Sequence, residues 1–287
     1  MTRGAVMPIR QTYFALRAGL VVLVLLLFVA VALEILGVGC RLGSISAYFH
    51  TSVRSVFVGT LCAIGALLLI YRGNTDTENM LLNFAGFLAF LIAFVPTELD
   101  QGCPGVADEA IISTSVANNV WAVLFIGLLV TILTVLFDWK GDGEEHLSRY
   151  ARVALTISAV GLAAGVAVFI WNRELVLEAG HSATALGFFA LIIAVVWANA
   201  LDLHRQETGS PTDSRMELAR RAARNRYGIV AIAMTVTTLG GVPLVIANQG
   251  LLFWLEAILI VEFAFFWFLQ TRELRGAATR AMARGGG

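Results

Sequence analysis

The stretch Gly43-Ser-Ile-Ser-Ala-Tyr-Phe-His-Thr-Ser-Val-Arg-Ser-Val-Phe-Val-Gly-Thr60 passes from a run of polar side chains directly into an apolar helix. Its polar part separates two apolar segments, each close to the roughly 20 residues that cross a bilayer as a helix. A loop this rich in hydrogen-bonding groups, placed where water meets lipid, is suited to form the wall of a pocket. We therefore expect it to be the polar end of a membrane helix bundle.

The composition of the whole chain sets the same class. Hydrophobic residues make up 58% of the sequence, charged residues 14%, and the mean hydropathy is +0.80. An ordinary soluble domain carries about 25% charged residues. The sequence thus predicts an all-α fold, a polytopic integral membrane bundle in one domain over residues 1–287. The formal net charge is zero, so no basic excess indicates a nucleic-acid partner.

Apolar segments long enough to cross a bilayer recur along the chain. We expect eight transmembrane helices, with a basic cytoplasmic loop or helix over residues 204–226. The expected spans cover residues 18–37, 54–71, 80–96, 120–139, 150–171, 181–203, 227–247 and 251–269.

The distribution of basic residues predicts the orientation. Cytoplasmic loops retain Lys and Arg. With the N-terminus inside, all but three of the 20 Lys and Arg residues lie on the cytoplasmic side, and the exceptions are Arg41, Arg54 and Arg173. Both termini are therefore expected in the cytoplasm, and the membrane is expected to be a plasma membrane, for a bacterial chain the inner one. The basic residues of 204–226 would attract anionic lipid.

Two of the three cysteines, Cys40 and Cys103, are expected on the outer face, where conditions are oxidising in many organisms. They could form a disulfide between the end of the first span and the loop after the third. The alternative is two thiols too far apart to bond.

Ionisable and polar side chains gather at one predicted depth, near the outer ends of several spans. Such groups are costly inside a membrane and mark functional sites. We expect them to line a pocket for a lipid, a small amphiphile or a partner protein, with Arg54 as the nearest cationic partner for the carboxylates. The candidates are Glu34, Ser46, Tyr48, His50, Arg54, Glu98, His181, Trp254 and Glu256.

Glu262 lies near the middle of the last expected span. It could hydrogen-bond a neighbouring helix through Thr235, Thr237 or Thr238, or it could serve as the relay of a proton-coupled carrier. Small residues repeat in two spans and predict internal packing faces, with a homo-oligomer contact as the alternative.

The pattern Ser46-x-x-x-His50 resembles the first metal motif of the alkaline ceramidase and adiponectin receptor superfamily, whose members hold zinc with a serine, an aspartate and three histidines. This resemblance implies a metal-dependent membrane hydrolase of lipid amides or esters, with His50 and His181 as ligands. However, Ala185 stands where the family's second histidine pair would be completed. Our leading expectation is therefore a protein without metal, cofactor or catalytic residues.

A second resemblance covers more of the chain. Ser46-Ala-Tyr48, the run Arg54 to Gly59, Asn83-x-Ala-Gly86 and Phe253-Trp-Leu-Glu256 resemble uncharacterised bacterial membrane proteins with about six such spans, and distantly the DRAM/Sfk-type membrane family. The resemblance implies a multi-span protein linked to lipid handling, in which the fourth and fifth spans are an addition. It implies no catalytic residue.

Overall fold

The computed structural model describes residues 3–97, 102–104, 109–140, 149–208, 220–277 and 279–284. Helices and the turns between them account for these residues, which confirms the predicted all-helical class for the described part of the chain. The elements are α1 (Arg3–Val38), η1 (Ser46–His50), α2 (Arg54–Ile70), α3 (Asp76–Phe94), α4 (Glu109–Lys140), α5 (Arg149–Trp171), α6 (Arg173–Thr208), α8 (Arg226–Ala247), η3 (Gln249–Leu251), α9 (Leu252–Glu273) and α10 (Arg280–Arg284).

Six helical segments within the described residues are long and apolar enough to cross a membrane, which is the pattern of a multi-pass membrane protein. Each expected span overlaps one helix, but α2 and the apolar part of α5 are shorter than these six. At 1.5 Å per residue, the 17 residues of α2 extend over about 25 Å. The number of eight crossings therefore stays a prediction. The six segments are Ile9–Val38, Asp76–Phe94, Ala117–Leu136, Ala179–Gln206, Arg226–Ala247 and Gln249–Glu273.

Polar side chains define where two of the apolar helices begin. The Thr75 hydroxyl oxygen accepts a hydrogen bond from the Glu78 backbone N–H at 3.1 Å, and Asn225 accepts from the N–H groups of Tyr227 and Gly228. The first N–H groups of a helix lack partners within the helix, and these side chains supply them. The starts of α3 and α8 are thus fixed outside their apolar segments.

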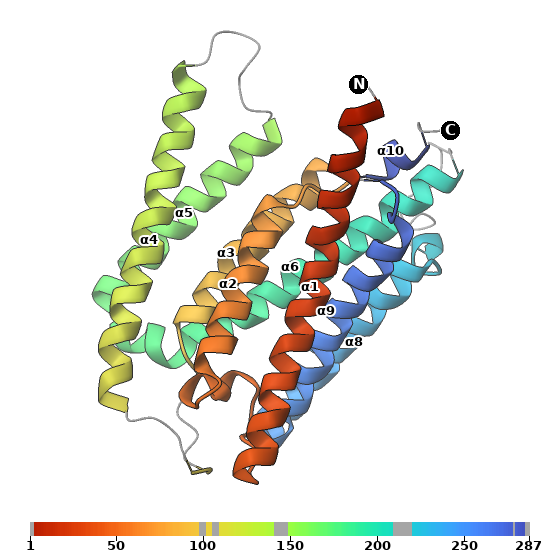
Figure 1. The fold of residues 1–287 in the computed structure, drawn as a ribbon. Coiled ribbons are helices and arrows are strands. Elements are labelled where there is room, and N and C mark those ends of the chain that lie inside the picture. Colours follow the sequence, from red (N-terminus) through yellow and green to blue (C-terminus); the bar gives the residue numbers. More distant parts are fainter. Residues whose placement is uncertain are drawn as a thin grey trace.

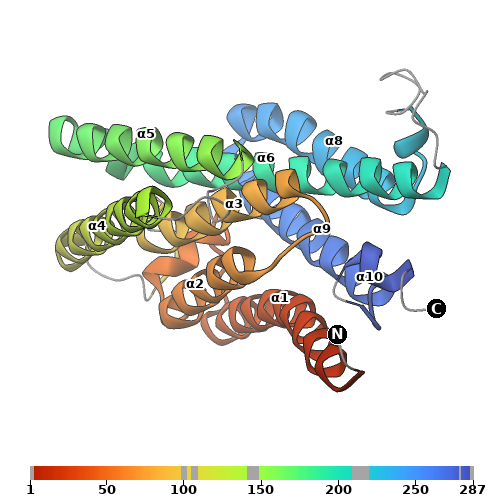
Figure 2. The same ribbon diagram turned by 90° about the horizontal axis from the view of Figure 1, so that it is seen from above.

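Six of the helices form a closed bundle, which we call the core bundle. It consists of α1, α2, α3, α6, α8 and α9, each packed on the next in that order, with α9 packed on α1. Helices α4 and α5 stand outside it; both pack on α3, and α5 also packs on α6 (Figures 1 and 2). This position is compatible with the implication that they are an addition to a six-span core.

The two ends of the core bundle carry different features (Figure 1). At one end, called the terminal end, the start of α1 lies near α10. The other, called the disulfide end, holds η1 and the Cys40–Cys103 disulfide. The start of α1 and α10 therefore lie at the same end of the bundle, and the side of the membrane that this end faces remains a prediction.

Candidate functional site

At the disulfide end, the Glu256 carboxylate of α9 holds the start of η1. Its Oε2 accepts hydrogen bonds from the backbone N–H groups of Ile45 at 2.6 Å and Ser46 at 3.1 Å, and its Oε1 accepts from the Ser46 hydroxyl at 2.8 Å. These N–H groups have no partner within a short helix that begins there. A carboxylate more than 200 positions away in sequence thus fixes the polar loop against α9.

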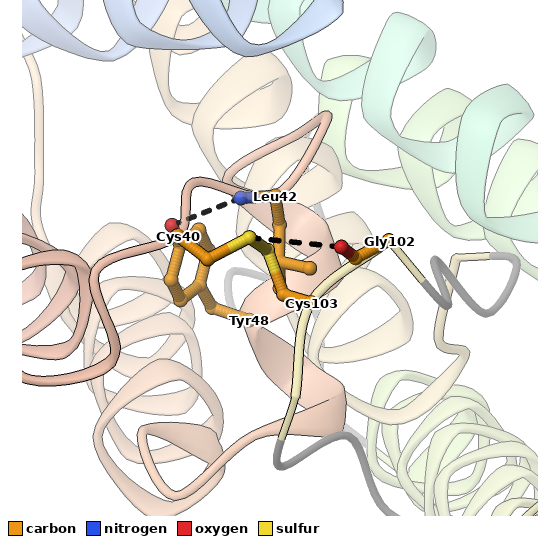
Figure 3. The surroundings of a disulfide bond; sticks show 5 residues. All are labelled: Cys40, Leu42, Tyr48, Gly102 and Cys103. Carbon is orange, nitrogen blue, oxygen red and sulfur yellow. Dashed lines mark hydrogen bonds between the residues drawn. A yellow bond between two sulfur atoms is a disulfide. The ribbon is translucent and has the colours of Figure 1, made fainter.

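The same loop is held on its other side by the disulfide (Figure 3). Cys40 and Cys103 are bonded, with their Cα atoms 5.8 Å apart, so the structure has the first of the two alternatives that the sequence left open. Beside the disulfide, the Tyr48 hydroxyl oxygen accepts a hydrogen bond from the Leu42 N–H at 3.3 Å. The loop between α1 and α2 is therefore fixed to both the segment after α3 and the start of α9.

Two buried histidines contact the segment that follows α3. His50 Nε2 lies 2.8 Å from the Thr97 carbonyl oxygen, and His181 Nδ1 lies 2.6 Å from the Val95 carbonyl oxygen. A carbonyl only accepts hydrogen bonds, so both of these ring nitrogens carry a hydrogen. The remaining nitrogen of His181, Nε2, has no hydrogen-bond partner among the described residues.

A cavity of about 800 Å³ lies inside the core bundle. This volume falls within the roughly 300–1,000 Å³ of small-molecule sites. Its walls are mostly leucine, isoleucine, valine and phenylalanine side chains from all six helices, including Phe57, Phe188 and Phe263. Its polar side chains belong to the loops and helix ends of the disulfide end: Ser44, Ser46, Thr97, His181, Ser182, Gln249 and Glu256.

The cavity opens between α6 and α8. Leu186 of α6 and Ile246 of α8 both line it, yet they are 47% and 79% exposed on the surface of the protein. Gln249 and Gly250 of η3 line it nearby and are also exposed. An exposed apolar side chain on an apolar helix of membrane length faces lipid, so the opening is directed toward the membrane rather than only toward water.

Of the nine residues that the sequence indicates for a pocket, Ser46, His181 and Glu256 line this cavity. Tyr48 and His50 are buried behind it and hold the loop in place through the contacts above. Glu98 lies outside the described residues.

The other three predicted residues have different surroundings. Glu34 accepts a hydrogen bond from the Ser52 hydroxyl at 2.7 Å, while the Arg54 guanidinium lies 4.4 Å from the centre of the Phe49 ring. Among the described residues Arg54 forms no ion pair with Glu34 or Glu256, so the structure does not show the expected pairing; the guanidinium lies over the Phe49 ring instead. Trp254 is 54% exposed and does not line the cavity, so its ring faces outward, with the Arg41 guanidinium 5.4 Å from it.

Glu262, further along α9, accepts a hydrogen bond from the Thr237 hydroxyl of α8 at 2.9 Å. Thr237 is one of the three partners that the sequence suggested. Glu262 does not line the cavity.

At the terminal end lies a buried polar network centred on Arg280, which the sequence analysis did not predict and which we call the terminal cluster. Arg280 is 3% exposed and pairs with Asp202 at 2.8 Å and Glu273 at 2.9 Å. It also donates to Asn199 Oδ1 at 3.1 Å. The cluster consists of Arg17, Tyr71, Asn74, Glu78, Asn199, Asp202, Tyr227, Gln270, Glu273 and Arg280.

Amide side chains extend the terminal cluster into the apolar helices. Asn199 Nδ2 donates to Glu78 at 2.9 Å, and Gln270 Nε2 donates to Asn199 Oδ1 at 3.1 Å. Arg17 of α1, fully buried, donates to the Ala277 carbonyl at 2.7 Å. The cluster therefore ties the segment after α9 to α1, α3 and α6.

The metal-ligating residue types do not gather in the described structure. Within the described ranges, no three His, Cys, Asp or Glu side chains come close enough to hold a metal ion together. His50 and His181 each bond a backbone carbonyl instead. The zinc hypothesis stays untested, and the described residues give it no ligand set.

Comparisons of the chain with protein-family models, with curated proteins and with solved structures find no match. The fold and the cavity nevertheless define a class: a helical protein with the apolar segments of a multi-pass membrane protein and an internal cavity. Both family resemblances stay predictions.

Proposed function

We propose that this protein binds a single-chain lipid or other small amphiphile in its cavity and performs no catalysis. The observation that carries the proposal is the division of the cavity into an apolar body and a polar disulfide end, with an opening between two lipid-facing helices. An amphiphile has the same division. A molecule lying in the bilayer could enter sideways between α6 and α8, leaving its chain in contact with apolar side chains throughout.

In this proposal eight helices cross the plasma membrane, the disulfide end faces outward, and both termini lie in the cytoplasm. The distribution of Lys and Arg and the presence of a disulfide support this orientation. On the cytoplasmic side, Arg220 and Arg224 are exposed and would contact anionic lipid, whereas Arg226 pairs with Glu273 at 3.0 Å.

The other hypotheses lack a comparable observation. A metal-dependent hydrolase needs a ligand set at the polar end, and the described residues supply none. A proton-coupled carrier based on Glu262 needs that carboxylate to reach the transported molecule, but Glu262 lies outside the cavity lining. A protein partner or a second copy of the chain would have no need of an internal apolar cavity.

Filling the cavity tests the proposal. Ala185 of α6 lines the cavity, and we expect Ala185→Trp to reduce the binding of tritiated monooleoylglycerol in nanodiscs at least tenfold, a change of about 1.4 kcal/mol. The indole would occupy the space of the chain. Ala190 on the same helix is exposed, so Ala190→Trp is the matched control and should bind as the wild type does. Equal binding by both variants, or no saturable binding by the wild type, would contradict the proposal.

The orientation has its own test in intact cells. A reductant and a maleimide-coupled polymer that do not cross the membrane should modify Cys40 and Cys103 after reduction, and neither before it. Cys62 lies inside α2 and should react only after denaturation. A gel shift measures the number of polymers added. Modification that requires permeabilised cells would place the disulfide end inside and overturn the orientation.

A further inference from the structure

The polar end of the cavity contains one acceptor that the protein leaves unused. His181 is 4% exposed and lines the cavity. Its Nδ1 donates to the Val95 carbonyl at 2.6 Å, while Nε2 has no partner among the described residues. A buried polar atom without a hydrogen bond is costly, and His181 belongs to the cavity wall, so a group that enters the cavity is suited to supply the partner of Nε2.

We infer that the cavity selects an uncharged single-chain amphiphile whose head group carries a hydroxyl, and that this hydroxyl donates a hydrogen bond to Nε2 of His181. The inference rests on the proposed function and specifies its ligand. The direction of the hydrogen bond follows from the tautomer: because Nδ1 carries the hydrogen of the neutral imidazole, Nε2 carries a lone pair and accepts.

The charges around the polar end argue against ionic head groups. Among the described residues that line the cavity there is no Lys or Arg, and the one acidic side chain is Glu256. A fatty-acid carboxylate or a phosphate would have to leave water without a counter-charge, which is strongly unfavourable.

A cationic head group is disfavoured for a different reason. Glu256 already accepts three hydrogen bonds from the loop, from Ile45 N–H and from the N–H and hydroxyl of Ser46. A carboxylate has about four acceptor positions, so Glu256 leaves only about one of them for the three donors of an ammonium group. A hydroxyl needs only the free lone pair of His181, with the Ser182 side chain also lining the polar end.

Two competing ligands with the same hydrocarbon chain separate the contribution of the hydrogen bond to binding from that of hydrophobic contact. Oleyl alcohol has an O–H donor, whereas oleyl methyl ether keeps the oxygen but cannot donate. In nanodiscs at pH 8, displacement of tritiated monooleoylglycerol from the wild type should require about 3- to 10-fold more ether than alcohol, the range for one neutral hydrogen bond. Oleate and oleylamine should compete more weakly than oleyl alcohol.

The variant His181→Asn links this preference to the histidine. An asparagine side chain can keep an N–H donor for the Val95 carbonyl while removing the acceptor at Nε2, so this variant should bind the alcohol and the ether equally. The matched control is Thr184→Val, one turn away on α6, because the Thr184 hydroxyl donates to backbone carbonyls and does not line the cavity. It should keep the wild-type preference.

The outcomes separate the two proposals. If the wild type binds the probe but does not distinguish alcohol from ether, or if His181→Asn keeps the preference, the inference about His181 is wrong and the binding function stands. If oleate or oleylamine binds more tightly than the alcohol, the uncharged class is wrong. If the probe does not bind saturably at all, the proposed function itself fails.

Discussion

Replacing Arg280 by methionine is expected to lower the free energy of unfolding by about 3–5 kcal/mol, the cost of removing one partner from a buried ion pair. Methionine keeps the length and apolar character of the stem but removes the cation that Asp202 and Glu273 share, so that Glu273 keeps the half-exposed Arg226 and Asp202 loses its ion pair. It also removes the donor to Asn199 Oδ1. The measurement is thermal unfolding of the purified protein in one detergent, followed by tryptophan fluorescence.

Arg275 provides the control for Arg280. It lies five positions earlier and is exposed, so Arg275→Met should change stability by no more than about 0.5 kcal/mol. Equal midpoints for the two variants would show that the terminal cluster does not hold the fold.

The charge state of Arg280 should not limit this effect at ordinary pH. Burial alone lowers the pKa of a guanidinium, but the hydrogen bond and negative charge of Glu273, together with the hydrogen bond to Asp202, raise the pKa of Arg280 above its usual value. The cation is thus retained wherever the protein is studied. The contribution of Arg280 to the free energy of unfolding should therefore not change as the pH rises, over the pH range in which the protein stays folded.

The positions of the helices were predictable because contact with lipid requires each helix to be apolar by itself. A segment such as 18–37 is apolar on all sides because lipid surrounds much of it, and hydropathy therefore locates it without knowledge of its neighbours. The helix itself is longer, Arg3–Val38, because hydropathy marks only the lipid-crossing part, and several further turns precede that part at the N-terminal end. Helix α3 likewise begins at Asp76, before the apolar part, because Thr75 supplies its N-terminal cap.

For the candidate site, the sequence indicates which residues lie at the same end of the bundle but not which side chains bond one another. Orientation placed Ser46, His181 and Glu256 at one end of the bundle, and all three line the cavity. Charge attraction suggested Arg54 as the partner of Glu256, whereas the structure gives Glu256 two backbone N–H groups and a hydroxyl. Those N–H groups lack a partner because the short helix η1 begins there, and no sequence pattern in the loop predicted that helix.

The terminal cluster was missed for a related reason. In the count of Lys and Arg that predicts the orientation, Arg17 and Arg280 enter only as positive charges, and such a count carries no information about burial. The signal that could have marked the cluster is the pair of amides, Asn199 and Gln270, near the ends of apolar helices. Besides each other, their partners include Tyr71, Glu78 and Arg280 from three other parts of the chain, and packing alone brings these together.

The second large effect is expected at Glu256. Glu256→Ala removes the acceptor of the Ile45 and Ser46 N–H groups, and each buried donor left without a partner costs about 1–3 kcal/mol. We expect the free energy of unfolding to fall by about 3 kcal/mol in total, with a loss of monooleoylglycerol binding because the loop that forms the polar end is no longer held against α9. Thermal unfolding and binding in nanodiscs measure the two effects.

The same change should also loosen the disulfide end locally, which a purely global loss of stability would not do. Because the loop between α1 and α2 is fixed by both Glu256 and the disulfide, its release should speed the reduction of Cys40–Cys103 by dithiothreitol well below the unfolding temperature. Glu262→Ala is the control on the same helix, since Glu262 accepts one hydrogen bond, from Thr237, far from the loop. It should cost about 1 kcal/mol and leave the reduction rate unchanged. Glu256→Gln retains one oxygen acceptor and should fall between the wild type and the alanine variant, whereas equal reduction rates in all four proteins would show that Glu256 does not hold the loop.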